Sequence, residues 1–319
     1  MGPADLEEII CDIRNSGSPK ILVGPGDDAG VHLIGNSAIV ETVDVIAPVV
    51  NDPFTFGAIS AANSISDVFA MGGKPLAALA IAGFPSCDYE PAVLREIIRG
   101  AVSTLTRSGA TLIGGHSFQN DEVRFGLSVT GIVDKERILR VSGAAEGDVI
   151  VMTKPIGIGI LTTALKGGKL TDTEIGPAVD WMLTLNDAAS VVAVQAMASA
   201  CTDITGFGLL GHAVNMLRDS SVDFVIKAEG VPVIERARVL ADSGMVPEGA
   251  YHNLKFMEGK VHFNPGISEV LRLILCDPQT SGGLLIAVKK DGLKLFEGAN
   301  IYHSVIGEVV RGSGILAVE

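Results

Sequence analysis

The stretch "NDPFTFGAISAANSISDVFAMGG" (residues 51–73) predicts one long helix with sharply marked ends. Asp52 is the expected N-cap, Pro53 fits the first turn, and the pair Gly72–Gly73 ends the helix. Most of the residues between are small or apolar, and Asp67 carries the only charge after the N-cap. A helix of this composition is expected in a protein core, so the presence of the Asp67 carboxylate has to be explained.

A helical wheel places Asp67 in line with Asn63 and Ser60, opposite an apolar set formed by Ala58, Ala62, Ile65 and Phe69. A single aspartate in a helix most often belongs to a solvated face. Such a face normally carries several Lys or Glu residues, and this helix has none. Small polar residues around one carboxylate instead suit a site that a ligand approaches closely.

Other aspartates occupy comparable places. The segment "VGPGDDAGV" (23–31) puts Asp27 and Asp28 in a glycine turn, which alone is more often an ordinary turn. Asp44 interrupts a β-branched strand pattern, and Asp203 in "CTDITGFG" stands before a glycine-rich turn. Isolated carboxylates brought together would repel one another unless a cation joined them. Oxygen ligands of this kind suit Mg²⁺, which typically bridges protein carboxylates and substrate phosphates.

The surrounding patterns predict two mixed α/β domains. Before a change in composition at residues 134–148, strands are expected at 38–50, 76–84, 110–117 and 124–133, with helices at 4–14 and 90–109. After it come further strands ("VIVMTKP", "SSVDFVIKA", "GGLLIAVKK") and helices ("GIGILTTAL", "AVDWMLTLNDAASVVAVQAM"). We therefore divide the chain into domains 1–145 and 146–319.

Composition excludes several classes of protein. The net charge of −13 argues against a nucleic-acid surface, which recruits clustered Lys and Arg. No apolar run is long enough for a membrane helix, and "MGPADLEEII" is acidic where a signal peptide is basic. The four cysteines show no CxxC spacing, which excludes the common zinc and redox motifs. A cytoplasmic protein is expected.

No phosphate-binding motif is decisive. There is no P-loop, and "GFGLLG" (206–211) matches GxGxxG but follows an Ala-rich stretch that predicts a helix rather than the required strand. A dinucleotide oxidoreductase is therefore a distant alternative. "LIGGHS" (112–117) fits a strand leading into phosphate-facing glycines and a simple tight turn about equally well. In "CDPQTSGGLL" (276–285) the structural interpretation, a turn leading into a strand, is favoured.

Taken in order, these segments resemble the selenophosphate synthetase (selenide, water dikinase) family. "GDDAGV" and the "SD…MG" helix occur across its superfamily, which includes aminoimidazole ribonucleotide synthetase, thiamine-monophosphate kinase and a hydrogenase maturation factor. "AMGGKP", "TKPIGIGILTTA", "TDITGFGLLGH" and "CDPQTSGG" resemble the selenium branch. The resemblance implies a two-domain aminoimidazole ribonucleotide synthetase-like fold whose N-terminal sheet pairs across a homodimer.

The resemblance also implies a reaction and its residues: ATP, selenide and water give selenophosphate, AMP and phosphate. Mg²⁺ would be held by Asp28, Asp44, Asp67 and Asp203. ATP would contact Gly26, Asp27, Asp44 and Asp67 of one subunit, with Ile113, Gly114 and Gly115 coming from the other. Asn63, one helical turn before Asp67, is expected near the metal ions from its spacing alone.

One family feature is not matched. An N-terminal Cys or selenocysteine, followed three residues later by a Lys, is expected before Met1, and neither Cys11 nor Lys20 fits these roles. A trimmed segment or a selenocysteine codon read as a stop would each explain this, and both leave the activity of the chain itself open. Two alternatives remain: a superfamily cousin that acts on another small molecule, and a non-catalytic ATP-binding regulator.

Overall fold

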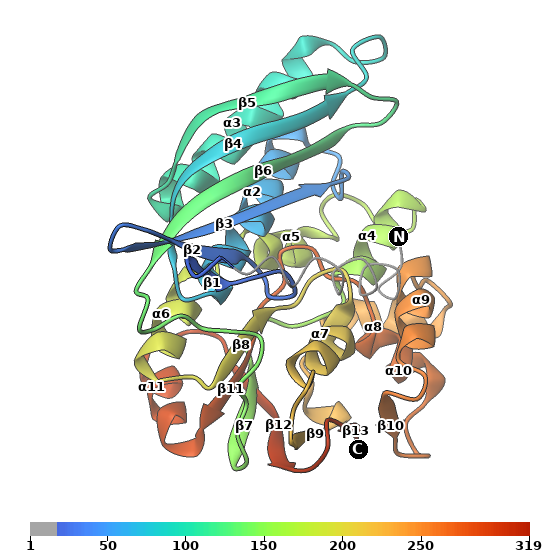
Figure 1. Ribbon diagram of the computed structural model, residues 1–319. Helices are drawn as coiled ribbons and strands as arrows, with labels where there is room; N and C mark the ends of the chain where they lie inside the picture. The colour runs from blue at the N-terminus through green and yellow to red at the C-terminus, as the bar shows by residue number, and fades with distance from the viewer. Residues whose placement is uncertain (1–17) are drawn as a thin grey trace.

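The computed structural model describes residues 18–319. They form two mixed α/β halves, with the N-terminal half drawn above the C-terminal half in Figure 1. The predicted two-domain, mixed α/β fold class is confirmed. The helix expected at residues 4–14 and Cys11 lie outside the described residues.

The N-terminal half is a six-stranded sheet of order β1-β2-β3-β6-β4-β5, in which only β4 and β5 pair in parallel. Its strands are β1 (Ile21–Val23), β2 (Gly30–Ile34), β3 (Ser37–Ile46), β4 (Lys74–Phe84), β5 (Thr111–Gln119) and β6 (Arg124–Val133). Two helices, α2 (Pro53–Ala70) and α3 (Pro91–Ser108), cover one face and lie behind the strands in Figure 1.

Helix α2 forms as its sequence predicts. The Asp52 carboxylate caps the helix by accepting from the Thr55 N–H at 2.7 Å, and Pro53 begins the first turn. After Met71 the chain turns through Gly72 at φ +75°, a left-handed conformation that glycine adopts without steric cost. Every residue from Phe56 to Ala70 is buried, so α2 is the central helix of this half.

The C-terminal half is a seven-stranded sheet of order β10-β13-β9-β12-β7-β11-β8. Its strands are β7 (Asp148–Met152), β8 (Ala200–Asp203), β9 (Val222–Ile226), β10 (Val261–Phe263), β11 (Leu284–Lys289), β12 (Ser304–Arg311) and β13 (Leu316–Val318). Its helices are α4 (Ile158–Lys166), α5 (Gly176–Leu183), α6 (Asp187–Gln195), α7 (Gly208–Met216), α8 (Glu235–Asp242), α9 (Glu248–Phe256), α10 (Glu269–Leu275) and α11 (Leu293–Gly298).

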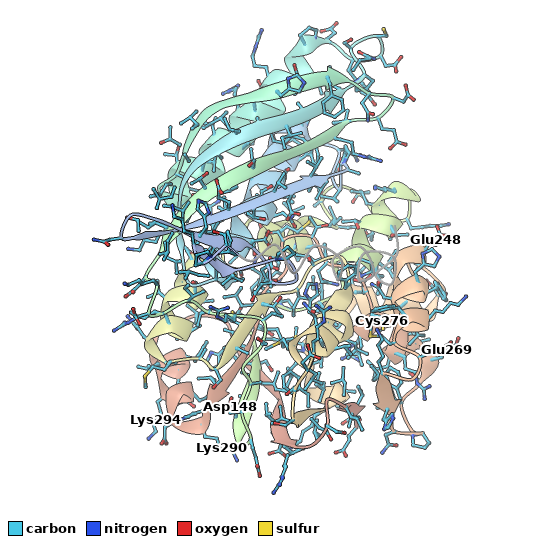
Figure 2. The ribbon with its side chains drawn as sticks, viewed as in Figure 1. Asp148, Glu248, Glu269, Cys276, Lys290 and Lys294 are labelled. Carbon is cyan, nitrogen blue, oxygen red and sulfur yellow. The ribbon has the colours of Figure 1, made fainter. Side chains whose placement is uncertain are left out.

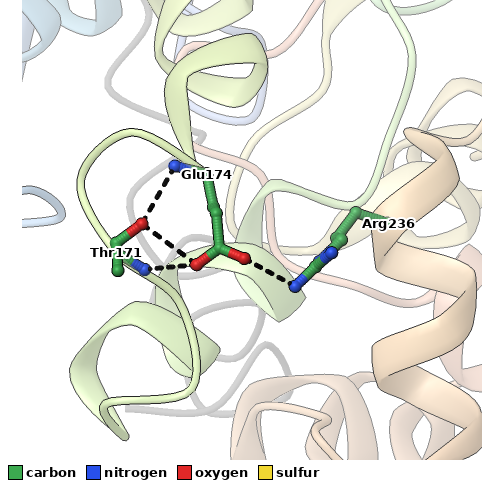
Figure 3. Close-up of polar contacts among 3 residues, drawn as sticks. All are labelled: Thr171, Glu174 and Arg236. Atoms are coloured by element: carbon green, nitrogen blue, oxygen red, sulfur yellow. Dashed lines mark hydrogen bonds and ion pairs between the residues drawn. The ribbon is translucent and has the colours of Figure 1, made fainter.

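This second sheet is buried on both faces. On β7, Ile150 and Met152 point into a core shared with α4, α5, α7 and α8, whereas Val149 and Val151 point into one shared with α6 and α11. The alternation follows from the period of two along a strand. A polar contact fastens one of the surface loops: Glu174 accepts from the backbone N–H and hydroxyl of Thr171 and pairs with Arg236 of α8 at 2.8 Å (Figure 3).

Candidate active site

The four aspartates that the sequence singles out as metal ligands come together where the two halves meet. Asp28 lies in the turn before β2, Asp44 on β3 and Asp67 on α2, while Asp203 ends β8 of the other half. Burial raises the pKa of all four carboxyl groups, and repulsion from Asp203 raises those of the other three further. The resulting pKa is about 7 for Asp44 and about 6 for Asp203.

On the N-terminal side, neighbouring polar groups fix the carboxylates. The Thr42 hydroxyl donates to Asp67 Oδ2 at 2.5 Å, and the Asn63 amide donates to Asp44 Oδ2 at 2.8 Å. Asp67 is only 9% exposed, so a solvated helix face is the wrong interpretation. Asn63 lies beside Asp44 of the cluster, and its place near the metal ions stays a prediction.

On the side of the cluster that faces β8, two carboxylate oxygens lack a hydrogen-bond partner among residues 18–319. Asp28 Oδ1 accepts from the Thr202 hydroxyl at 2.7 Å, and the nearby Ser66 hydroxyl partly offsets the rise that burial causes in the pKa of Asp203. Asp28 Oδ2 and Asp203 Oδ2 are buried and have no hydrogen-bond partner within residues 18–319. Burying such an oxygen unpaired is costly, and a cation would relieve both that cost and the mutual repulsion. The donor set therefore fits a hard cation such as Mg²⁺.

The cluster is not a closed metal cage. Among the residues that the structure describes, no three His, Cys, Asp or Glu side chains are arranged to hold a metal ion by themselves. Mg²⁺ usually takes one or two carboxylates and completes its shell with water and substrate phosphates. An open carboxylate cluster is therefore the form expected of a site that binds metal together with a nucleotide.

The glycine turn before β2 borders both the carboxylates and a cavity of about 490 Å³. Gly26 has φ +107°, a conformation reserved for glycine. Asp27 accepts from its neighbour Asp28 N at 3.0 Å and from Val141 N at 3.1 Å, which ties the turn to the connection between the halves. With Asp28, both residues line the cavity, and α7 and the segment 256–260 close its far side.

Ile113, Gly114 and Gly115 lie elsewhere. They belong to β5, at the opposite edge of the sheet from β1, and the strand runs on to Gln119. The tight-turn interpretation of this segment is therefore wrong. Ile113 sits at an irregularity in the β4–β5 pairing and is 67% exposed. Within one chain, the strands β6 and β4 separate this segment from Asp44 on β3.

Comparison with known proteins identifies the family. Residues 26–133 match the N-terminal domain, and residues 145–318 the C-terminal domain, of AIR synthase related proteins. The selenide, water dikinase of Citrifermentans bemidjiense is 45% identical over 98% of this chain and 93% of its own length. That of Caldanaerobacter subterraneus is 44% identical over 91% of this chain and 85% of its own length. The chain belongs to the selenide, water dikinase family.

Solved structures agree on the fold. A thiamine monophosphate kinase from Aquifex aeolicus superposes with a TM-score of 0.69 at 19% identity, covering 100% of this chain and 98% of its own. The hydrogenase maturation protein HypE in complex with ATP gives 0.67 at 14% identity, over 97% and 86% of the two chains. At such identities these likenesses show the fold alone. Family membership supports selenophosphate synthesis as the enzymatic activity, and neither a superfamily cousin nor a regulator is favoured.

The geometry of the glycine-rich segment 206–211 does not fit dinucleotide binding. The predicted helix ends earlier than expected, at Gln195, and the short buried strand β8 precedes the segment. Yet β8 lies at a sheet edge, antiparallel to β11 and far from β9, so within residues 18–319 this segment opens no parallel βαβ unit. Gly208, at φ +69°, is required for packing: a Cβ there would lie 2.7 Å from the backbone of Cys276.

Sequence reasoning missed two buried polar residues near the cluster. Lys154, at the end of "VIVMTK", is 2% exposed, and its ammonium donates to the carbonyls of Thr184 at 2.6 Å and Ser281 at 2.8 Å. Burial lowers the pKa of Lys154 to about 7. Asn186 is also buried and bonds across to α2. A lysine at the end of an apolar strand was the available signal for the first residue.

The buried cysteines are unsuited to nucleophilic chemistry. Burial raises the pKa of Cys201 far above its usual range and that of Cys276 to about 12, so both stay as thiols at neutral pH. Cys276 follows α10 inside the C-terminal half, where Figure 2 labels it.

Proposed function

We propose that the chain converts ATP, selenide and water into selenophosphate, AMP and phosphate at the carboxylate cluster. Four buried, mutually repelling carboxylates, two of them with an unpartnered oxygen, are the observation that carries this proposal. We assign the metal ligands as Asp28, Asp44, Asp67 and Asp203, and the nucleotide contacts as Gly26, Asp27, Asp44 and Asp67. Residues 1–145 then form the nucleotide and dimerisation domain.

Phosphoryl transfer requires positioning and charge neutralisation more than covalent help from the protein. Bound Mg²⁺ would supply that neutralisation on the phosphate oxygens. The residues of the chain do the rest: Thr42, Asn63 and Thr202 hold the carboxylates in fixed orientations. Gly26 leaves the turn free of a side chain, so that phosphate oxygens can approach its backbone. ATP as the nucleotide is supported by the ATP complex of the HypE neighbour.

The uncovered face of the N-terminal sheet supports a homodimer. Within the described chain, α2 and α3 cover one face only, and large apolar side chains stand exposed on the rest of the sheet: Val43, Val45, Leu76, Leu79, Ile113, Phe118 and Ile132. A patch of this kind on a monomer marks an interface, and the open edge of β5 invites pairing. A partner copy seated here would bring its Ile113–Gly115 toward the carboxylates that this segment cannot reach within one chain.

We place the protein in the cytoplasm because Cys87, Cys201 and Cys276 are unpaired, as in a reducing compartment. In the part of the chain that the structure describes, no helix is long and apolar enough to cross a membrane.

The test is ³¹P NMR of the protein with Mg-ATP under anaerobic conditions, with and without selenide. The proposal predicts selenide-dependent appearance of selenophosphate together with AMP and phosphate. Thiamine phosphate added in excess should leave the reaction unchanged. Nucleotide binding without selenophosphate would contradict the activity but not the nucleotide site, whereas phosphorylation of thiamine phosphate would favour a superfamily cousin.

A further inference from the structure

The turn at Ser281–Gly282, in the motif "CDPQTSGG", connects the C-terminal half to the carboxylate cluster. The backbone N–H of Ser281 donates to Asn63 Oδ1 at 2.8 Å. The amide of the same Asn63 donates to Asp44 Oδ2, also at 2.8 Å. A residue of the second half thus fixes the orientation of an asparagine that in turn orients an aspartate of the first.

The next residue of the turn makes a second bridge of the same kind. Asn186 donates from its amide to the carbonyl of Gly282 and to the Ser66 hydroxyl, both at 2.9 Å. Ser66 lies close enough to Asp203 to interact with its carboxyl group. Asn63 and Asn186 are both buried, so neither bridge competes with solvent.

Lys154 fixes the turn itself. Its ammonium donates to the carbonyl of Ser281, and its backbone packs so closely that a Cβ on Gly283 would lie 2.4 Å from Lys154 N. Ser281 is held at φ +50°, a conformation that costs free energy for a residue with a side chain. Such strain persists only where surrounding contacts enforce it, which is what the bonds to Lys154 and Asn63 provide.

We propose that the Ser281–Gly282 turn, held by Lys154 and Asn186, positions Asp44 and Asp203 for metal binding across the boundary between the halves. The inference rests on the proposed role of these two aspartates as metal ligands. Lys154 and Asn186 are positioning residues: both hold the Ser281–Gly282 turn, Asn186 also bonds Ser66, and the charge of Lys154 acts on Asp203. The motif is thereby more than the turn that its sequence suggested.

The test measures Mn²⁺ binding by electron paramagnetic resonance in the presence of a methylene analogue of ATP, which needs no turnover. Lys154→Met and Asn186→Ala each remove one support of the turn and should weaken Mn²⁺ binding about tenfold, as loss of a supporting residue typically does. Thr104→Val is the matched control, since it removes a buried hydroxyl-to-carbonyl bond, from Thr104 of α3 to Ala58, away from the turn. The thermal stability of all three is measured alongside.

The proposal requires Lys154→Met or Asn186→Ala to lose metal affinity while Thr104→Val, at a comparable loss of stability, keeps it within about twofold. Equal affinities in all folded variants would overturn it and leave these residues with a structural role alone. Absence of Mn²⁺ binding in the unaltered protein would overturn the metal-ligand assignment as well. This outcome differs from equal affinities in all variants, so the two failures can be told apart.

Discussion

Asp67 combines a requirement for function with a cost for folding. Burial first, then repulsion from Asp203, Asp44 and Asp28, raises its pKa well above the usual value. Asp67→Asn keeps the shape but removes the charge, so it should raise the melting temperature in the absence of divalent ions. It should also lower selenophosphate formation on the order of 100-fold or more, given the several kcal/mol that a metal supplies to a transition state.

Calorimetry in EDTA checks the melting temperature, and the ³¹P assay checks selenophosphate formation. Asp121→Asn, at an exposed loop, is the control and should change neither quantity. An Asp67→Asn protein that is less stable than the unaltered one, or fully active, would contradict the assignment.

The same electrostatics predict a pH dependence for Asp44. Its pKa is 3.8 ordinarily and about 7 in the folded protein, so the native state binds this proton more tightly than the unfolded chain. Between these two values the free energy of unfolding therefore falls as pH rises, when metal is absent. Asp44→Asn lacks this contribution. Urea unfolding in EDTA at about pH 4.5 and pH 7.5 should therefore show a smaller fall in the free energy of unfolding for the variant than for the unaltered protein. Identical losses would refute the raised pKa.

At this scale the sequence alone singled out the aspartates that the structure brings together, and Asp67 first, because a lone carboxylate in an apolar helix is conspicuous. Lys154 and Asn186 escaped it. Lys154 bonds backbone carbonyls more than 25 residues away, and Asn186 bonds one such carbonyl and a hydroxyl of the other half. No local pattern encodes such contacts.

Among the elements, the crossing of α2 and α3 depends on two glycines. A Cβ on Gly57 would lie 1.8 Å from the Ile97 carbonyl oxygen, and one on Gly100 would lie 1.9 Å from that of Phe54. Alanine favours an exposed helix by about 1 kcal/mol over glycine, but here the clash is with backbone and cannot be relieved by a side-chain rotation.

We therefore expect Gly57→Ala to lower the free energy of unfolding by about 2 kcal/mol or more, measured by urea denaturation. Gly176→Ala, in α5 with no atom within 4 Å of the added carbon, is the matched control and should cost little. A neutral or stabilising Gly57→Ala would show that the helices do not pack as closely as described.

The ends of α2 were predictable because capping chemistry is local, with Asp52 and Pro53 at one end and Gly72 at the other. Strand β8 was not, because Ala200 and Cys201 have no strand preference strong enough to overrule the helical pattern before them. Pairing with β11 decides that segment, and this is a tertiary contact.

For the whole molecule, the dimer proposal predicts a change of association state. Leu79→Asp places a charge on the uncovered sheet face, on β4 beside the edge strand β5, and should convert a dimer to a monomer in sedimentation experiments. Val239→Asp, on α8 of the other half, replaces an even more exposed apolar residue and should leave the dimer intact. A dimer that survives Leu79→Asp would exclude this face.

The two-domain fold was predictable from the change in composition after residue 133 together with the order of motifs. The docking of the halves was not, since it depends on long-range bridges such as those to Ser281. A site divided between two domains can be anticipated residue by residue, but its geometry comes only from the assembled structure.

The most direct test of the central claim is a crystal structure with Mn²⁺ and the methylene analogue of ATP, read by anomalous scattering. The account predicts Mn²⁺ peaks in ligand contact with Asp28, Asp44, Asp67 and Asp203, bridging them to the nucleotide phosphates. Peaks elsewhere, with the four carboxylates unligated and the phosphates bound away from them, would contradict it.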